Sequence, residues 1–331
     1  MDVRLARTGA ERRQQYFSNN RFFADAFNFL LYGGEEVIKE DKLKEVDTTQ
    51  ITVPYGNHAR LPVQKYRDLL RLWNAMEDEN AIYVLLGSEL QGRVHYGMPV
   101  KNGLYDMIGY SKQIEESRWS YQRKENDSDL LTGDAELVSD NGTLKIKLTS
   151  EEFLSGWRKG DKLIPIITAV IYLGDSPWDG PKSLFEMLNV PDKRLYRFLN
   201  DYKLNLISPA DMGEGEFEKF HTDLGLAMKV IKHQKEDADE VIKETNHRKI
   251  DRDTAFFLNR AVNLGLEYEE KDGGIDMCLA MEKKTLRDKI TGAIEILKDE
   301  GISDEAIIDR IVKKFNVTKE DVLELFVPQK L

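Results

Sequence analysis

Three polar residues in the first third of the chain have the types and the spacing for catalysis. Asp68 lies in the stretch YRDLLRLW (66–73), and Glu89 and Gln91 lie in the stretch LLGSELQGR (85–93). Two carboxylates on neighbouring strands repel each other unless a cation lies between them. Carboxylate oxygens are ligands that suit Mg²⁺ or Mn²⁺, and such an ion can orient water and stabilise charge on a phosphate. The residues therefore fit a phosphodiester hydrolase, and they also fit the solvated end of a core strand.

The two stretches must lie side by side for these side chains to meet. The apolar run 81–91 alternates with a period of two, so Glu89 and Gln91 project to the same side of a strand. The run 66–73 is ambiguous, because its apolar residues have helical spacing while its length and the polar loop after it fit one arm of a hairpin. We favour the hairpin, which brings Asp68 on the first arm close to Glu89 on the second.

The remaining pattern predicts alternating helices and strands. We expect an apolar helix at 21–32 that ends at Gly33-Gly34, and an amphipathic helix at 103–122. Strands are expected at 50–53, 163–173 and 203–207. Asn141-Gly142 is the expected turn of a hairpin inserted near 135–148. This order indicates an α/β fold. The chain is mainly helical from about residue 214, so we expect one domain over 1–210 and a helical C-terminal region over 211–331.

The composition is that of a globular protein, with 331 residues, 41% of them apolar and 32% charged. No stretch has the length and hydrophobicity of a membrane span or a signal segment, so we expect a cytoplasmic protein with no membrane partner. The net charge of −11 argues at first against a nucleic-acid partner, because phosphate binding depends on Lys and Arg. However, the first 125 residues carry 18 basic and 18 acidic side chains, so this part could still hold a phosphodiester.

The chain has one cysteine, Cys278, and five histidines. One cysteine excludes an intrachain disulfide and cannot make a thiolate zinc site alone. Its apolar neighbours indicate a core residue, so no chemistry is assigned to it. The histidines show neither HxH nor HExxH spacing, and the sequence therefore indicates no histidine-based metal site.

Several longer sequence segments are more specific than these patterns. They are RFFADAFNFLLYGG (21–34), YRDLLRLW (66–73), LLGSELQ (85–91), VHYGMPVK (94–101), Tyr105-Asp106, EFLSGWRK (152–159), LIPIITAVIY (163–172), WDGPKSL (178–184) and DYKLNLI (201–207). In this order they resemble the Rpn/YhgA-like family, whose members are described as recombination-promoting nucleases or putative transposases of the PD-(D/E)XK nuclease superfamily. The resemblance covers most of residues 20–330.

The resemblance implies a restriction-endonuclease-like α/β core, with a helix, a three-stranded antiparallel sheet, a second helix and a further strand. It implies a DNA endonuclease that depends on Mg²⁺ or Mn²⁺ and acts in recombination or on mobile elements. Asp68 corresponds to the first metal-binding acid, Glu89 to the acid of the E-x-K element, and the Leu90 carbonyl to a further metal ligand. Asp25 on the first helix corresponds to an accessory acid near the site.

Gln91 falls where the wider superfamily has a lysine, although E-x-Q is a usual form in the Rpn-like branch. An amide can orient water by hydrogen bonding, but it carries no charge and is not a base near neutral pH. More of the catalytic work would then fall on the metal or on a neighbouring cation, for which the sequence offers Arg93, Lys101 and Arg67. We therefore expect Gln91 to belong to the catalytic set in a positioning role.

The alternative is a nuclease scaffold with little or no activity that binds DNA or protein, with a helical tail that binds a partner or forms a homo-oligomer. Six apolar tail residues motivate the oligomer, namely Ile290, Ile294, Leu297, Ile307, Ile311 and Phe315. The same residues also fit the core of a small helical domain. The sequence leaves both interpretations open.

Overall fold

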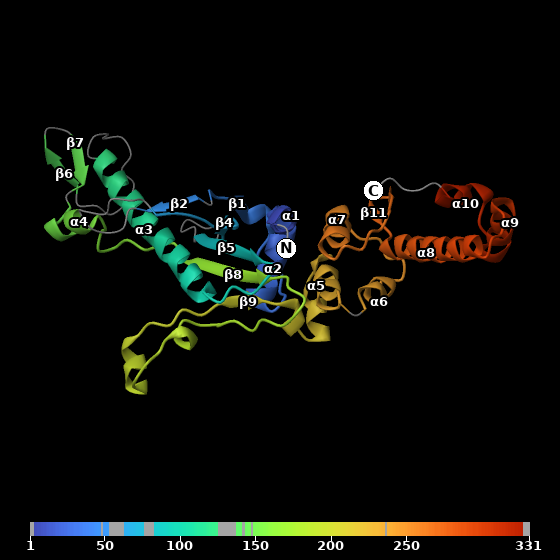
Figure 1. Cartoon of the computed structure of the whole chain (residues 1–331). Coiled ribbons are helices and arrows are strands. Elements are labelled where there is room, and N and C mark those ends of the chain that lie inside the picture. The colour runs from blue at the N-terminus through green and yellow to red at the C-terminus, as the bar shows by residue number, and fades with distance from the viewer. Residues whose placement is uncertain are drawn as a thin grey trace. The chain divides into compact units, whose positions relative to one another are not determined.

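The computed structural model describes residues 3–47, 49–52, 63–75, 83–124, 137–140, 143–146, 148–235 and 237–326. Within this part the chain divides into two compact units, residues 1–232 and 233–331. The first unit is α/β, and the second is mainly helical (Figure 1). Each unit is described by itself below.

A five-stranded mixed sheet forms the centre of the first unit. Its strands, in spatial order, are β1 (Leu43–Glu45), β4 (Leu69–Asn74), β5 (Tyr83–Gln91), β8 (Ile166–Tyr172) and β9 (Asn205–Ile207). The first three strands pair antiparallel, whereas β5, β8 and β9 pair parallel. Strands β5 and β8 are apolar along most of their length because both are central in the sheet.

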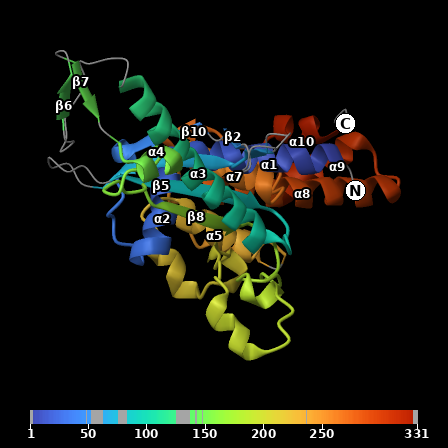
Figure 2. The same ribbon diagram turned by 90° about the vertical axis from the view of Figure 1, so that its left-hand side faces the viewer.

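The described part of the first unit also contains five helices. They are α1 (Val3–Ser18), α2 (Asn20–Tyr32), α3 (Met98–Lys124), α4 (Ser150–Ser155) and α5 (Leu224–Lys232), with short 3-10 turns at Glu40–Lys42, Phe185–Met187, Lys193–Phe198, Pro209–Asp211 and Glu214–Lys219. In both views α3 crosses the strands at an angle, and it contacts β8 (Figures 1 and 2). It connects the parallel strands β5 and β8. Helix α1 contacts β4 and β5. The connection through α3 is of the kind that parallel neighbours require.

The structure has the expected alternation of helices and strands, with one difference. The strand expected at 50–53 is β2 (Thr49–Thr52), which pairs with β3 (Val63–Tyr66) and is not part of the central sheet. The strand beside β4 in the sheet is β1, which was not predicted, so the order runs α2, β1, β4, β5, α3, β8. Gly33 has the left-handed conformation at the end of α2, where the helix was expected to end. Helix α3 begins at Met98, five residues earlier than the periodicity predicted. Its first turn carries Pro99, which is favoured at a helix start, and this turn brings Lys101 into the helix.

Two hairpins branch from the first unit. One pairs β2 (Thr49–Thr52) with β3 (Val63–Tyr66), and the other pairs β6 (Leu137–Asp140) with β7 (Thr143–Ile146). The second is the hairpin expected near 135–148, although the Asn141-Gly142 turn itself lies outside the described residues. The predicted single arm at 66–73 is wrong in one respect, because β3 ends at Tyr66 and β4 begins at Leu69. Asp68 therefore lies in the break between two strands rather than on an arm.

The first unit ends later than the expected boundary at residue 210. Phe220 stacks on Phe29 of α2, with ring centroids 4.5 Å apart. Thr222 also binds Asp25 of α2 through its backbone N–H and its hydroxyl. These contacts hold the segment up to Lys232 on the α/β unit.

The second unit contains five helices and one two-stranded sheet in its described part. They are α6 (Ala238–Lys243), α7 (Arg252–Ala261), β10 (Glu270–Lys271), β11 (Gly274–Ile275), α8 (Met277–Asp299), α9 (Asp304–Phe315) and α10 (Lys319–Phe326). The tail residues that suggested an oligomer form the unit's own core. Ile290, Ile294, Ile307 and Ile311 are buried there, and Leu297 and Phe315 pack against them. None of the described helices has the length and apolar character needed to cross a membrane.

Candidate active site

Glu89 is a fully buried carboxylate near the end of β5. Its Oε2 accepts a hydrogen bond of 2.6 Å from Nζ of Lys101. Within the described part of the chain, its Oε1 is buried with no hydrogen-bond partner. Burial raises the pKa of Glu89 to about 7, the Lys101 charge opposes this rise, and the charge of nearby Asp68 adds to it. A buried, half-satisfied carboxylate of this kind costs stability unless something else binds it.

Asp68 is held against the backbone of Leu90. Its Oδ2 accepts a hydrogen bond of 2.7 Å from the Leu90 N–H, and its own carbonyl accepts one of 3.1 Å from Gln14 Nε2. Pairing between β4 and β5 ends at Leu69 and Ser88, so the Leu90 backbone extends beyond β4. The N–H and C=O of one strand residue point to the same neighbour, and the Leu90 carbonyl therefore faces the side on which Asp68 lies.

Lys101 supplies a cation that pairs with Glu89. It lies in the first turn of α3, and its Nζ is 5.5 Å from the centroid of the buried Tyr105 ring, one turn further along the helix. Burial acts to lower the pKa of Lys101, but the charge and hydrogen bond of Glu89 outweigh it, and the pKa is raised. Above about pH 7 the two side chains therefore form an ion pair, and below it Glu89 takes up a proton.

A buried network behind the site fixes the backbone at Asp68. The neighbouring Arg67 is 2% exposed, pairs with Asp106 at 2.9 Å and donates to the Thr168 hydroxyl. The Tyr202 hydroxyl donates to the other oxygen of Asp106. The sequence places Gly87 under this arginine because an added Cβ would lie 2.7 Å from Arg67 Cδ.

Arg13 of α1 is a second cation at the site that the sequence did not indicate. A Cβ added at Gly92, just after β5, would lie 2.9 Å from Nη1 of Arg13. Burial lowers the pKa of Arg13, and the charge of Asp68 opposes this. Helix α1 was not expected, because the charged N-terminal stretch carries no clear apolar stripe. Its Tyr16 and Phe17 at the end are the buried pair that could have signalled it.

Gln91 lies two residues after Glu89 at the end of β5, half-buried. Its carbonyl accepts a hydrogen bond of 2.8 Å from Leu173, which continues the β5–β8 pairing. Within the described residues its side-chain amide makes no hydrogen bond to protein. The amide is therefore available to water or a ligand near Glu89, as the alternation of the strand predicts.

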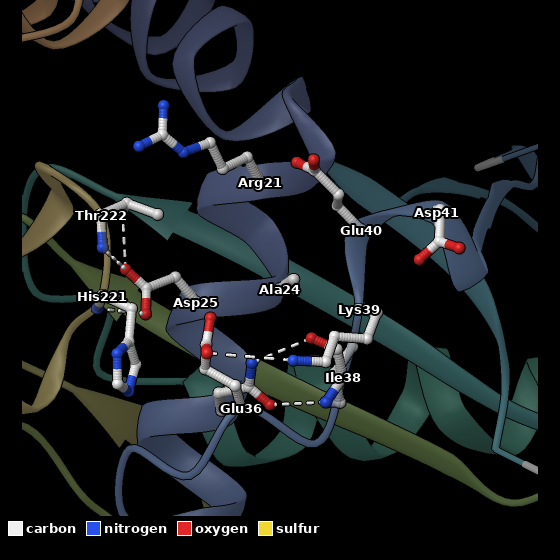
Figure 3. Close-up of a pocket in the computed structure, with 11 residues that line it drawn as sticks. Arg21, Ala24, Asp25, Glu36, Ile38, Lys39, Glu40, Asp41, His221 and Thr222 are labelled. Carbon is white, nitrogen blue, oxygen red and sulfur yellow. Dashed lines mark hydrogen bonds and ion pairs between the residues drawn. The ribbon is translucent and has the colours of Figure 1, made fainter.

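Asp25 lies elsewhere. It is buried on α2, and its two oxygens accept hydrogen bonds from the backbone N–H groups of His221 and Thr222 and from the Thr222 hydroxyl. Figure 3 shows this carboxylate turned toward His221 and Thr222 at a pocket of about 450 Å³. Asp68, Glu89, Leu90 and Gln91 are not among the described residues that line this pocket. The structure thus uses Asp25 to fix the loop before α5 and does not bring it into contact with Asp68 or Glu89.

Together the site contains two acids, two cations, an amide and the backbone of Leu90 beyond the end of β4, all within one unit. The donor set is made of oxygens and fits a hard divalent cation such as Mg²⁺ or Mn²⁺. The buried Glu89 Oε1, which lacks a protein partner, is the atom that such a cation would satisfy. Asp68, Glu89 and the Leu90 carbonyl are the groups that could hold it.

No protein-family model, curated protein or solved structure matches this chain.

Proposed function

We propose that this protein is a divalent-metal-dependent nuclease that hydrolyses phosphodiester bonds of DNA, with a core of the PD-(D/E)XK type. The element order α2, β1, β4, β5, α3, β8 supports this fold assignment, because it is the order that the family resemblance implies. The place of Asp68 and Glu89 at one end of the central strands supports the function. The resemblance to the Rpn/YhgA-like family further suggests a role in recombination or on mobile elements.

The observation that carries the proposal is the state of Glu89. A fully buried carboxylate with one oxygen lacking a partner is expensive, and a purely structural role would favour an amide or an apolar side chain. Asp68 increases this cost by adding a second negative charge nearby. Such strain is typical of a site that is built to bind something positively charged.

Each residue then has a distinct task. Asp68, Glu89 and the Leu90 carbonyl would hold Mg²⁺ or Mn²⁺, which supplies positive charge to the phosphate and lowers the pKa of water. Gln91 donates and accepts hydrogen bonds and so orients water without taking its proton. Lys101 carries the positive charge that Gln91 lacks, from a helix instead of from the strand.

Arg13 adds a guanidinium group near Asp68 and the end of β5. A guanidinium presents several N–H donors in one plane and binds phosphate oxygens well. Its place on α1 suits a contact to the DNA backbone next to the cleaved bond. Two cations close to two acids allow the site to accept a phosphodiester despite the negative charge of the whole chain.

Plasmid nicking tests the proposal. Purified protein is incubated with supercoiled DNA, linear duplex, single-stranded DNA and RNA, each with Mg²⁺, Mn²⁺ or EDTA. We expect metal-dependent cleavage of DNA that falls by roughly 10²-fold or more in Asp68→Asn and Glu89→Gln, because each removes charge at the centre of the site. Asp41→Asn is the matched control, since Asp41 is an exposed acid of the same unit. Folded protein without cleavage under any condition, or full activity in Asp68→Asn, would refute the proposal.

A charge relocation tests the role of Lys101. Lys101→Met should lower cleavage by roughly 10²-fold, because the site loses the positive charge that pairs with Glu89 and keeps only that of Arg13. Adding Gln91→Lys to this variant returns a lysine to the end of β5 and should restore part of the activity. Activity unaffected by Lys101→Met would show that Lys101 only neutralises Glu89.

One observation favours a second candidate, a DNA-binding scaffold without catalysis. The ion pair between Lys101 and Glu89 already neutralises one of the two acids in the absence of metal. Anisotropy measurements with labelled DNA distinguish the two functions. Tight binding in EDTA that is equal in wild type and Asp68→Asn, together with no cleavage by either, would establish the scaffold.

A further inference from the structure

The helical unit brings together three metal-ligating side chains that are not part of the proposed nuclease site. A ring nitrogen of His247, the thiol of Cys278 and a carboxylate oxygen of Glu282 all lie within 4.8 Å of one another. Cys278 is buried, whereas His247 and Glu282 are exposed. The group thus has a sulfur ligand at its base and two ligands that water and ions can reach.

Separate elements place these ligands. Cys278 and Glu282 are four residues apart on α8, so they lie on the same face of the helix. His247 lies in the turn after α6 with a left-handed backbone, at a φ of 62°. The backbone of Ile250 pairs with that of Ile275, which anchors this turn beside the start of α8.

Asp276 provides an independent indication of a metal site. Its Oδ2 lies 3.0 Å from Nδ1 of His247, and its Oδ1 caps α8 by accepting from the Leu279 N–H at 2.8 Å. Because an ionised carboxylate only accepts, Nδ1 is the donor to Asp276, which leaves Nε2 as the ring nitrogen that a metal ion could take. Nε2 lies 3.7 Å from a Glu282 oxygen. A carboxylate that orients a histidine in this way is the usual support for a metal-bound imidazole.

We propose that His247, Cys278 and Glu282 bind one Zn²⁺ ion, with water as the fourth ligand. A thiolate, an imidazole and a carboxylate form a borderline-soft ligand set that suits zinc and does not suit Mg²⁺. Two ligands on a tetrahedral zinc ion lie roughly 3.3 to 3.8 Å apart, so the side chains need only small movements to close on it. The ion would link the α6–α7 turn to α8 and stabilise the helical unit. It is independent of the proposed nuclease function.

Cobalt provides a specific probe, because the chain has only one cysteine. Co²⁺ replaces zinc in tetrahedral sites, and its thiolate charge-transfer band would report on Cys278 alone. The apoprotein, prepared under reducing conditions, is titrated with Co²⁺ and then with Zn²⁺ while absorbance is followed. Thermal unfolding with and without Zn²⁺ provides a second readout.

We expect a thiolate–cobalt band that saturates at one ion per chain, is displaced by Zn²⁺ and accompanies a rise in Tm. His247→Ala and Glu282→Gln, both at exposed positions, should weaken binding by about tenfold or more, and Cys278→Ser should abolish the band. Glu295→Gln is the matched control, since Glu295 is an exposed acid of the same helix. Asp68→Asn should leave the band unchanged, which separates this site from the nuclease site.

Two results would overturn the proposal. The first is wild-type protein with native circular dichroism and no thiolate–cobalt band. The second is a band that persists at full affinity in both His247→Ala and Glu282→Gln, which would show that the cysteine binds cobalt without the proposed partners.

Discussion

Replacing Glu89 with glutamine should stabilise the metal-free protein at alkaline pH and destroy its metal response. Glutamine has the same shape, and its side-chain oxygen can still accept from Lys101. It carries no charge, so the cost of burying an ionised group beside Asp68 disappears. Lys101 keeps partial contact with water in the variant because its side chain is 29% exposed.

The pKa of Glu89 gives the size and the direction of the expected change in stability. Burial raises this pKa from 4.5 to about 7 in the folded protein. Below pH 4.5 the side chain is protonated in both the folded and the unfolded state and has no effect on stability. Between these values only the folded state holds the proton, so the free energy of unfolding falls as pH rises, by about 1.4 kcal/mol per pH unit. Above pH 7 the side chain is ionised in both the folded and the unfolded state, and the buried charge lowers the free energy of unfolding by its full amount of about 3 kcal/mol.

Urea unfolding in EDTA at pH 5 and pH 8 measures this effect. The stability gained by Glu89→Gln should grow from about 1 kcal/mol at pH 5 to about 3 kcal/mol at pH 8, because other titrating groups cancel between variant and wild type. Glu116→Gln is the control, since Glu116 is an exposed residue of α3 that pairs with Lys112 at 3.9 Å. It should change stability by no more than about 0.5 kcal/mol at either pH.

Metal provides the second half of the prediction. Mg²⁺ or Mn²⁺ at about ten times its dissociation constant should stabilise wild type by about 1.4 kcal/mol at pH 8 and should not stabilise Glu89→Gln. The reasoning is refuted if Glu89→Gln destabilises the protein equally at pH 5 and pH 8, because the buried carboxylate would then have an ordinary pKa. Equal metal stabilisation of both proteins would remove Glu89 from the proposed ligand set.

Three further predictions concern the structure around the site. Gly87→Ala should lower the free energy of unfolding by about 2 kcal/mol or more, because the new methyl group meets the buried Arg67. Gly160→Ala is the control and should change it little, because nothing lies within 4 Å of the added methyl group. Equal effects of the two substitutions in urea unfolding would contradict the packing argument. Asp106→Asn should cost about 3 kcal/mol, because it leaves Arg67 buried without its counter-ion, and a loss below about 1 kcal/mol would contradict this. Asp25→Asn should lower the free energy of unfolding by about 1 to 3 kcal/mol, because it weakens the hydrogen bonds from the backbone N–H groups of His221 and Thr222. Cleavage per folded molecule should not change. A variant that is as stable as wild type but cleaves less would show that Asp25 belongs to the catalytic set.

The strands were readable from the sequence because their signals are local. The apolar, β-branched run at 166–172 and the alternating run at 83–91 both indicate buried strands from their composition alone. The period of two places Glu89 and Gln91 on one side of the strand. The α/β fold class followed from the order of such signals. The arm at 66–73 was harder to predict because, at the strand break, the Asp68 carboxylate accepts a hydrogen bond from the backbone N–H of Leu90, which is 22 residues away.

The sequence by itself brought out Asp68, Glu89 and Gln91, the family resemblance added that a lysine is missing at Gln91, and Arg93, Lys101 and Arg67 remained as possible substitutes. Only the tertiary structure shows which of these cations lies beside Glu89. Arg67 is taken up by the buried network with Asp106, while the early start of α3 directs Lys101 to Glu89. The choice depends on how a helix packs across the sheet, and local patterns do not contain that information.

The same limit applies to three other features. The family resemblance implied Asp25 as an accessory acid, while residue type and spacing favoured Cys278 as an inert core residue and gave no metal site to the histidines. Folding brings Asp25 to the loop at Thr222, which is 197 residues away, and brings His247 to Cys278 and Glu282. Ligand sets drawn from distant turns and helices have no fixed spacing in sequence, because it is the packing of the elements that sets the distances between their side chains.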